Sequence, residues 1–239
     1  MTSQEQPKPS APPNADDILK QFAKPLLIAC RIVLLALFRV VKWIRRVHWN
    51  VRGTSTITEL ELPVIFASNH QSHIDTHVIL ATLPRQIRNH TAVAAAYDHF
   101  ADSDGTSKKK KMIQFFVAAI WHAFGIDRIH SPISSIRTMQ NLLLRNWSIV
   151  IYPEGTRSRT GEIAPFKPGL AVVAKKSGRP VVPIYINGGI NVLPEATYLP
   201  RSGTIHVSFG EPLHFQQDES SKDFMARVET AVRTMACNS

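Results

Sequence analysis

Cysteine is scarce in this chain of 239 residues, which has only Cys30 and Cys237. No C-x-x-C pair or zinc-type spacing occurs, so the sequence indicates neither a disulfide framework nor a structural metal site. Acidic residues are also few: 18 Asp and Glu stand against 28 Lys and Arg, for a formal net charge of +10. Such a charge attracts phosphate-rich partners, namely anionic lipid, phosphorylated substrates or nucleic acid.

Two further absences narrow the function. No recognised nucleic-acid-binding motif and no aromatic–basic platform is present, so we expect no nucleic-acid partner. No G-x-S-x-G elbow occurs, which argues against a serine hydrolase. The chain does have a hydrophobic content of 44% and a charged content of 19%, values typical of a globular protein with one sizeable core.

The N-terminal region divides into a tail and a basic apolar segment. Residues 1–17 begin with a Pro-, Ser- and Gln-rich stretch that can bury little surface, and they are predicted to be a flexible tail. This stretch lacks the charged start and apolar centre of a secretory signal peptide. Residues 18–48 carry many Lys and Arg between apolar runs, and no Asp or Glu.

Arg31 and Arg39 interrupt the apolar runs, so the segment lacks the roughly 20 apolar residues of a spanning helix. Trp43 and Trp49 suit a lipid–water boundary. We therefore predict that residues 18–48 form a basic amphipathic helical element that docks on an anionic membrane surface. A core helix with a basic solvent face and a bent or single-spanning anchor remain alternatives.

The remainder, residues 49–239, is predicted to be one α/β domain. Short apolar runs typical of buried strands alternate with helical patterns, which favours a mixed or parallel, largely buried sheet flanked by helices. The predicted strands are residues 63–68, 148–152, 180–186 and 204–209, and the predicted helices are 76–83, 110–123, 134–145, 168–176 and 220–236.

The most informative segment is N-H-Q-S-H-I-D, residues 69–75, which directly follows a predicted strand. His70 and Asp75 can touch only if the chain turns from the strand end into a helix between them. Asp75 would then orient the His70 ring and make it a usable general base. Two other interpretations stay open: Asp75 only caps the helix, or His70, His73 and His77 bind a metal.

A second segment, Y-P-E-G-T-R-S, begins at Tyr152 after another predicted strand. Gly155 lets the backbone approach a ligand closely, and Arg157 offers a planar fork suited to phosphate. Glu154 either fixes Arg157 or binds a substrate hydroxyl. Lys167 adds a cation at the start of a predicted helix, where anions bind well. An ordinary charged turn is the alternative for this segment.

These two blocks, in this order and about 80 residues apart, resemble the N-H-x-S-x-x-D and P-E-G-T-R-S blocks of the glycerolipid acyltransferase family, typified by lysophosphatidic acid acyltransferase. The resemblance covers roughly residues 45–215. It implies that His70 and Asp75 are catalytic and that Arg157 and Glu154 contact the glycerol phosphate. Arg128 corresponds to the arginine that ends another block of the family, whose start this chain does not match. The implied substrate-binding set is Glu154, Gly155, Thr156, Arg157, Arg128 and Lys167.

The resemblance also implies the reaction. A fatty acyl group passes from acyl-CoA or acyl carrier protein to the hydroxyl of a lysophospholipid, with lysophosphatidic acid as the expected acceptor, and the reaction needs no metal and no cofactor. The implied location is the cytoplasmic face of the cell membrane, as a peripheral or monotopic protein. A non-catalytic lipid-binding or membrane-scaffold protein with the same fold is the alternative.

Overall fold

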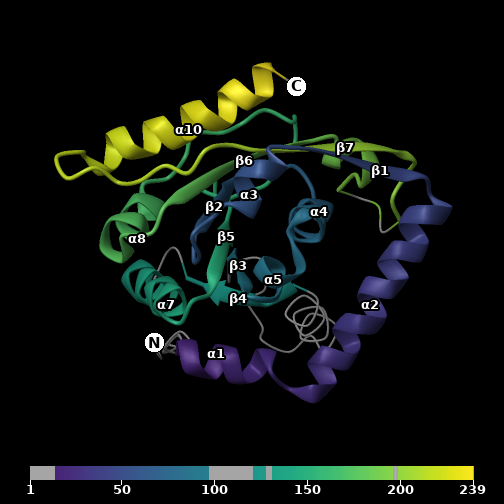
Figure 1. Ribbon diagram of the computed structural model, residues 1–239. Coiled ribbons are helices and arrows are strands. Elements are labelled where there is room, and N and C mark those ends of the chain that lie inside the picture. The colour runs from purple at the N-terminus through teal and green to yellow at the C-terminus, as the bar shows by residue number, and fades with distance from the viewer. Residues whose placement is uncertain (1–13, 97–120, 128–130, 196, 198, 239) are drawn as a thin grey trace, which may run out of the picture.

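A seven-stranded mixed sheet forms the centre of the protein, in a computed structural model that describes residues 14–95 fully, the backbone of residue 96, and residues 121–127, 131–195, 197 and 199–238 (Figure 1). The strands are β1 (Val47–Arg52), β2 (Ile65–Ser68), β3 (Thr91–Ala96), β4 (Ala123–Ile126), β5 (Ser148–Ile151), β6 (Val181–Asn187) and β7 (Gly203–Phe209). Their order in the sheet is β1-β7-β6-β2-β5-β3-β4. Only the β6–β7 pair is antiparallel among these neighbours. The structure confirms the predicted α/β class with a mixed sheet.

Helices cover both faces of this sheet. They are α1 (Ala15–Phe22), α2 (Pro25–Ile44), α3 (Thr54–Thr58), α4 (Ile74–Thr82), α5 (Arg85–Asn89), α7 (Pro132–Leu144), α8 (Gly169–Ser177), α9 (Gly189–Val192) and α10 (Ser221–Cys237). One apolar core joins α1, α7, α8 and α10 to the sheet, and a second joins α3, α4, α5 and α9 to its other face. Strand β2 is buried on both sides, because Ile65 and Ala67 belong to the first core while Phe66, like Val64 just before the strand, belongs to the second.

Local signals fix several boundaries of these helices. Pro25 is the first residue of α2, where its missing N–H costs no hydrogen bond. Helix α8 ends at Gly178, whose φ of 66° is the left-handed conformation that glycine adopts readily. Ser220 caps α10 by accepting a hydrogen bond from the Asp223 N–H at 3.1 Å. The predicted strands and the described predicted helices lie within about two residues of their observed bounds.

Three strands differ from the sequence-based expectation. The chain enters the sheet at Val47, before the predicted domain boundary at residue 49, because β1 pairs in parallel with β7. Strands β3 and β4 were not predicted as strands, and the alanine-rich β3 has little strand propensity of its own. The predicted helix at 110–123 falls mostly outside the described residues.

The N-terminal helices pack differently from each other. Helix α1 begins at Ala15, so the last three residues of the predicted tail are helical, and Ile18 and Phe22 are buried. By contrast, Leu27 is the only buried residue of α2. The outer face of α2 is apolar, with Leu26, Ile32, Val33, Leu37, Val40, Trp43 and Ile44 exposed. This does not fit a core helix with a basic solvent face. Among the described residues, no helix has the length and apolar character needed to cross a membrane.

Candidate active site

The two motif segments meet at one edge of the sheet. Strands β2 and β5 are parallel neighbours, so their carboxyl ends lie side by side. His70 follows the end of β2 by two residues, and Glu154 follows the end of β5 by three. The carboxyl edge of a parallel sheet is where α/β proteins place ligands, and the predicted site lies there.

His70 and Asp75 are in direct contact. The His70 Nδ1 lies 3.0 Å from Asp75 Oδ2, and Asp75 is fully buried in the first turn of α4. The same oxygen accepts hydrogen bonds from the backbone N–H groups of Gln71 at 2.6 Å and Ser72 at 2.7 Å. Asp75 therefore both closes the start of α4 and orients the His70 ring. The catalytic and capping interpretations of the sequence are compatible.

The backbone of His70 is held on both sides by the second motif. Its N–H donates to Glu154 Oε1 at 2.7 Å, and its carbonyl accepts from the Ser158 N–H at 2.8 Å. These bonds fix the His70 main chain, while Asp75 fixes its ring. This pair of hydrogen bonds joins two motifs that lie more than 80 residues apart in the sequence.

Glu154 plays a different part from the one predicted. It is buried, and its second oxygen accepts from the Ala164 N–H at 2.8 Å. Both carboxylate oxygens thus accept hydrogen bonds from backbone N–H groups. Glu154 does not line the cavity beside His70 that is described below. Burial raises the pKa of this carboxyl, although its two backbone hydrogen bonds oppose the shift. The predicted contact with a substrate hydroxyl does not fit this geometry.

The other polar residues of the first motif anchor the segment to its neighbours. The Asn69 side chain donates to the Ile186 carbonyl at 2.9 Å and accepts from the Ile186 N–H at 2.8 Å, so it pairs with β6 as a strand residue would. The Ser72 hydroxyl donates to the Leu193 carbonyl at 2.6 Å. The turn between β2 and α4 is therefore held by side chains as well as by the backbone.

Gly189 lies against the back of the carboxylate. A Cβ built on Gly189 would overlap Asp75 Oδ1, and it would lie 3.3 Å from the Ser72 Cβ. Asp75 Oδ1 is buried and accepts no hydrogen bond from the described part of the chain. The absence of a side chain at Gly189 thus lets Asp75 keep Oδ2 on His70.

A cavity of about 880 Å³ opens beside His70. Its apolar walls come from β3, β4, α7 and α8, and include Val93, Ile126, Met139 and Leu170. Its polar lining includes four of the predicted residues, Gly155, Thr156, Arg157 and Lys167. The Gly155 N–H donates to the Tyr152 carbonyl at 3.0 Å, so this amide is not free to stabilise an oxyanion. Cavities of this size enclose organic ligands, and this one combines apolar walls with charged residues of both signs: the cations Arg157 and Lys167 and the carboxylates Asp127 and Glu195.

Arg157 has a carboxylate neighbour that the sequence did not indicate. Its Nη2 lies 3.3 Å from Glu195 Oε1, and Arg159 Nε lies 3.8 Å from the other oxygen of Glu195. Arg128, the remaining predicted residue, lies outside the described residues. Within the described ranges, no group of three or more His, Cys, Asp or Glu gathers as a metal site would require.

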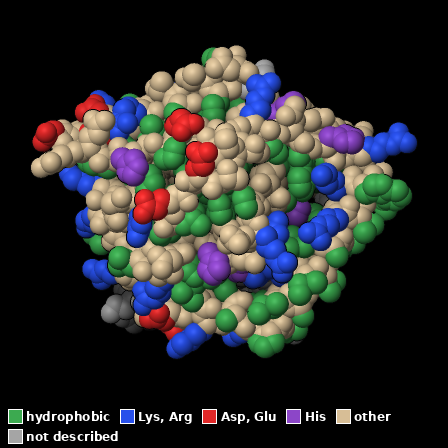
Figure 2. All heavy atoms as spheres, viewed as in Figure 1, with side chains coloured by type: hydrophobic (Ala, Val, Ile, Leu, Met, Phe, Trp, Pro, Cys, Tyr) green, Lys and Arg blue, Asp and Glu red, His purple; other side chains and the backbone are tan. Residues whose placement is uncertain are grey.

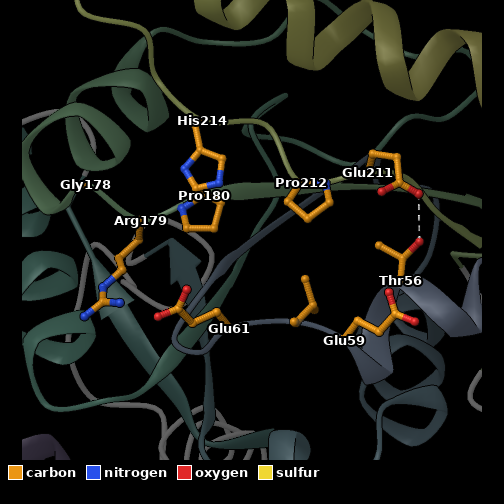
Figure 3. Close-up of a pocket in the computed structure, with 10 residues that line it drawn as sticks. Thr56, Glu59, Glu61, Gly178, Arg179, Pro180, Glu211, Pro212 and His214 are labelled. Carbon is orange, nitrogen blue, oxygen red and sulfur yellow. Dashed lines mark hydrogen bonds between the residues drawn. The ribbon is translucent and has the colours of Figure 1, made fainter.

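A second cavity, of about 300 Å³, lies at the opposite ends of the strands (Figure 3). Glu61 precedes β2, Arg179 precedes β6, and Glu211 follows the antiparallel β7, so all three belong to that far edge. Thr56 donates to Glu211 at 3.0 Å across it. None of the predicted site residues lines this cavity.

Sequence reasoning considered Ser72 only as the start of a helix cap that ends at Asp75, and it gave no role to Asn69, Gly189, Tyr152 and Glu195. Asn69, Ser72 and Tyr152 stand inside the two motifs, so their position was available as a signal. Gly189 and Glu195 carry no local signal, because their contacts with Asp75 and Arg157 cross between separate segments.

Comparison with known proteins gives the family. The family model described as Acyltransferase matches residues 48–187, which is more than half of the chain and contains both motifs. The chain therefore belongs to the acyltransferase family.

Two relatives agree with this placement. A chloroplastic 1-acyl-sn-glycerol-3-phosphate acyltransferase of Brassica napus is 24% identical over 174 residues, which are 69% of this chain and 45% of that protein. The 1-acyl-sn-glycerol-3-phosphate acyltransferase of Bacillus subtilis (strain 168) is 35% identical over 106 residues, 44% of this chain and 50% of that protein. The chain spans about half the length of these relatives.

The crystal structure of the 1-acyl-sn-glycerophosphate (LPA) acyltransferase PlsC from Thermotoga maritima matches with a TM-score of 0.63 and 22% sequence identity. The match covers 92% of this chain and 86% of that one. At this identity the similarity shows a shared fold.

Proposed function

We propose that this protein transfers a fatty acyl group from the thioester of acyl-CoA or acyl carrier protein to a lysophospholipid hydroxyl, and that its acceptor is lysophosphatidic acid, which becomes phosphatidic acid. The observation that carries the proposal is the His70–Asp75 pair beside a cavity with apolar walls and with Arg157 and Lys167 in its lining. The names of the distant relatives support the choice of acceptor.

His70 is the general base in this reaction. With Nδ1–H donated to Asp75, the other ring nitrogen, Nε2, is left to take the proton from the acceptor hydroxyl. The acceptor oxygen attacks the thioester carbonyl, the C–S bond breaks, and the proton passes from His70 to the leaving thiolate. Asp75 stabilises the imidazolium between these two proton transfers.

Binding follows the division of the cavity. The acyl chain occupies the apolar part, where burial contributes about 0.8 kcal/mol for each methylene. Arg157 holds the acceptor phosphate through its planar fork, and Lys167 and the Thr156 side chain line the same part. Glu154 acts on His70 and not on the acceptor, since both of its oxygens bind backbone amides.

Membrane docking completes the proposal. Helix α2 exposes apolar side chains on its outer face and also carries the exposed Arg39, and Figure 2 shows hydrophobic and basic side chains together along the edge where α2 runs. A helix of this composition binds at the lipid–water interface, with its basic residues on anionic head groups. Long-chain substrates then reach the cavity from lipid.

The test is acyl transfer by purified protein in mild detergent. Palmitoyl-CoA and lysophosphatidic acid are supplied, and thiol release and lipid product are followed together for the wild type and for His70→Ala. Phosphatidic acid formed by the wild type and lost in a folded His70→Ala variant supports the proposal. If no product forms with palmitoyl-CoA, the assay is repeated with palmitoyl acyl carrier protein. A folded wild type that binds lysolipid but forms no product with either of these donors instead supports a lipid-binding scaffold.

A further inference from the structure

Tyr152 is the closest aromatic neighbour of His70 among the described residues. The two rings are stacked, with centroids 3.9 Å apart and planes 15° from parallel. Tyr152 directly follows β5, so a regular strand sets the position of its ring. The stack covers one face of the imidazole, while Asp75 binds its edge through Nδ1.

The Tyr152 ring is itself held in place. Its hydroxyl lies 2.7 Å from Thr76 Oγ1, and Thr76 directly follows Asp75 in α4. One helical turn therefore anchors both the carboxylate at the edge of His70 and the aromatic ring on its face. Neither contact needs the substrate to be present.

The hydroxyl of Tyr152 is not suited to carry a proton. Burial away from water, and then the negative charge of Asp75, raise the pKa of this phenol, although its hydrogen bond with Thr76 opposes the shift. Tyr152 therefore stays neutral while His70 changes charge. What it offers His70 is the face of its ring, whose quadrupole attracts a cation.

We propose that Tyr152 is a positioning residue of the acyl transfer. Its ring keeps the His70 imidazole parallel to itself and stabilises the imidazolium that forms when His70 takes the acceptor proton. This inference rests on the proposed function, because it assigns a role to Tyr152 only if His70 is the base. It requires the ring of Tyr152 and does not require its hydroxyl.

The titratable groups that contact His70, within the described residues, come from two segments. Asp75 belongs to α4, and Tyr152 and Glu154 follow β5. Substitution of Tyr152 leaves both carboxylates in place, so a change in the pH dependence of transfer reports the loss of the ring.

The experiment compares Tyr152→Phe with Tyr152→Leu. Phenylalanine keeps the stack and loses the hydroxyl, so it should retain kcat within about threefold, the effect of one neutral hydrogen bond. Leucine fills the space without a π face, so kcat should fall about tenfold while the acceptor KM stays within about twofold. The acidic limb of the pH–rate profile should move to lower pH in Tyr152→Leu alone, because the imidazolium loses its neighbour.

A readout without turnover separates this inference from the proposed function. Ring protons of His70, assigned by their loss in His70→Ala, should resonate upfield in the wild type and Tyr152→Phe because they lie over an aromatic ring, and should move downfield in Tyr152→Leu. If Tyr152→Leu unfolds, Tyr152→Met gives the same comparison. A protein that shows the upfield signals but transfers no acyl group retains the stack and loses the proposed function.

Two results overturn the inference. Equal loss of kcat in the phenylalanine and leucine variants assigns the effect to the hydroxyl and Thr76. A leucine variant with the wild-type kcat, or with reduced kcat and an unmoved acidic limb, removes Tyr152 from any part in holding the charged form of His70.

Discussion

Arg157 and Glu195 form an ion pair inside the lining of the large cavity, with Nη2 and Oε1 3.3 Å apart. The Arg157 side chain is 21% exposed and that of Glu195 is 58% exposed, so the carboxylate can leave while the guanidinium stays. A phosphate that binds Arg157 through Nη2 competes with Glu195 for this group. This contact therefore weakens acceptor binding in the proposed reaction.

Glu195→Gln should lower the KM for lysophosphatidic acid by roughly two- to fivefold, the range expected for an exposed ion pair, and change kcat less. Initial rates across acceptor concentrations at low ionic strength measure this. Glu162→Gln is the matched control, because it removes the same charge from an exposed residue of the 154–165 segment. An equal fall of KM in both variants would show that overall charge is responsible.

Asp75→Asn tests the carboxylate that orients His70. The amide oxygen can still accept from the N–H groups of Gln71 and Ser72, but it carries no charge to stabilise an imidazolium. We expect kcat to fall roughly 10²–10⁴-fold in a variant that remains folded. Thiol release with circular dichroism measures both properties.

Ser72→Ala is the control for this substitution. It removes the hydroxyl bond to the Leu193 carbonyl and keeps the Ser72 N–H on Asp75. It should retain kcat within about threefold, since one neutral hydrogen bond is lost. A larger loss than in Asp75→Asn would place the main effect in the anchoring of the turn.

Glu154→Gln separates a role in positioning His70 from a role in acceptor binding. Glutamine offers one acceptor where Glu154 uses two, and its NH₂ group would face a backbone N–H of His70 or Ala164. The free energy of unfolding should fall by about 1–3 kcal/mol, and kcat should fall with little change in acceptor KM.

Arg157→Gln provides the contrast, because it should raise the acceptor KM and leave the free energy of unfolding nearly unchanged. Denaturant titration and initial rates distinguish the two variants. If Glu154→Gln instead raises KM as Arg157→Gln does, without loss of stability, the carboxylate contacts the acceptor.

His77 should make the stability of the fold depend on pH. This residue is buried between α4 and α2, where its ring stacks on Phe38 with centroids 4.2 Å apart. Burial first, and then the charges of Arg88, Lys42 and Arg39, lower its pKa from 6.5 to about 4. Between these values the unfolded chain binds the proton and the folded chain does not, so stability falls as the pH drops from 6.5 to 4.

His77→Phe keeps an aromatic ring and has no group that titrates. Between pH 7 and pH 4 its free energy of unfolding should therefore fall by roughly 3 kcal/mol less than that of the wild type. The free energy of unfolding in denaturant, measured from pH 7 to 4, gives the comparison. His48→Gln changes an exposed histidine of β1 and should follow the wild-type profile. Parallel profiles for the wild type and His77→Phe would exclude this origin of acid sensitivity.

The outer face of α2 should determine membrane binding. The double variant Leu37→Ser, Trp43→Ala removes two exposed apolar side chains from this face. Its affinity for anionic vesicles, measured by sedimentation, should fall tenfold or more, because each such side chain contributes roughly 1.5–3 kcal/mol when it is buried in lipid. Leu144→Ser removes an exposed leucine from the end of α7 and should bind as the wild type does. Equal binding of the double variant and the wild type would contradict docking through α2.

The central strands and the main helices could be predicted because their signals are local. Short apolar runs rich in β-branched residues, such as residues 181–186, are typical of strands buried on both faces of a sheet. Pro25, Gly178 and Ser220 mark helix ends through their own backbone or side-chain chemistry. Strands β1 and β3 escaped prediction, because pairing with β7 and β5 decides their conformation. Strand pairing depends on partners far away in the sequence.

For the site, the sequence by itself determined which groups the proposed chemistry uses: a histidine and a carboxylate five residues apart across a strand–helix corner, and an arginine after a second strand. Only the tertiary structure decided what surrounds them. It directs Glu154 to the backbone of His70, stacks Tyr152 on the imidazole, places Gly189 behind Asp75 and sets Glu195 on Arg157. These contacts join the ends of β2, β5 and β6, which become neighbours only when the sheet forms, and spacing along the chain carries no record of that proximity.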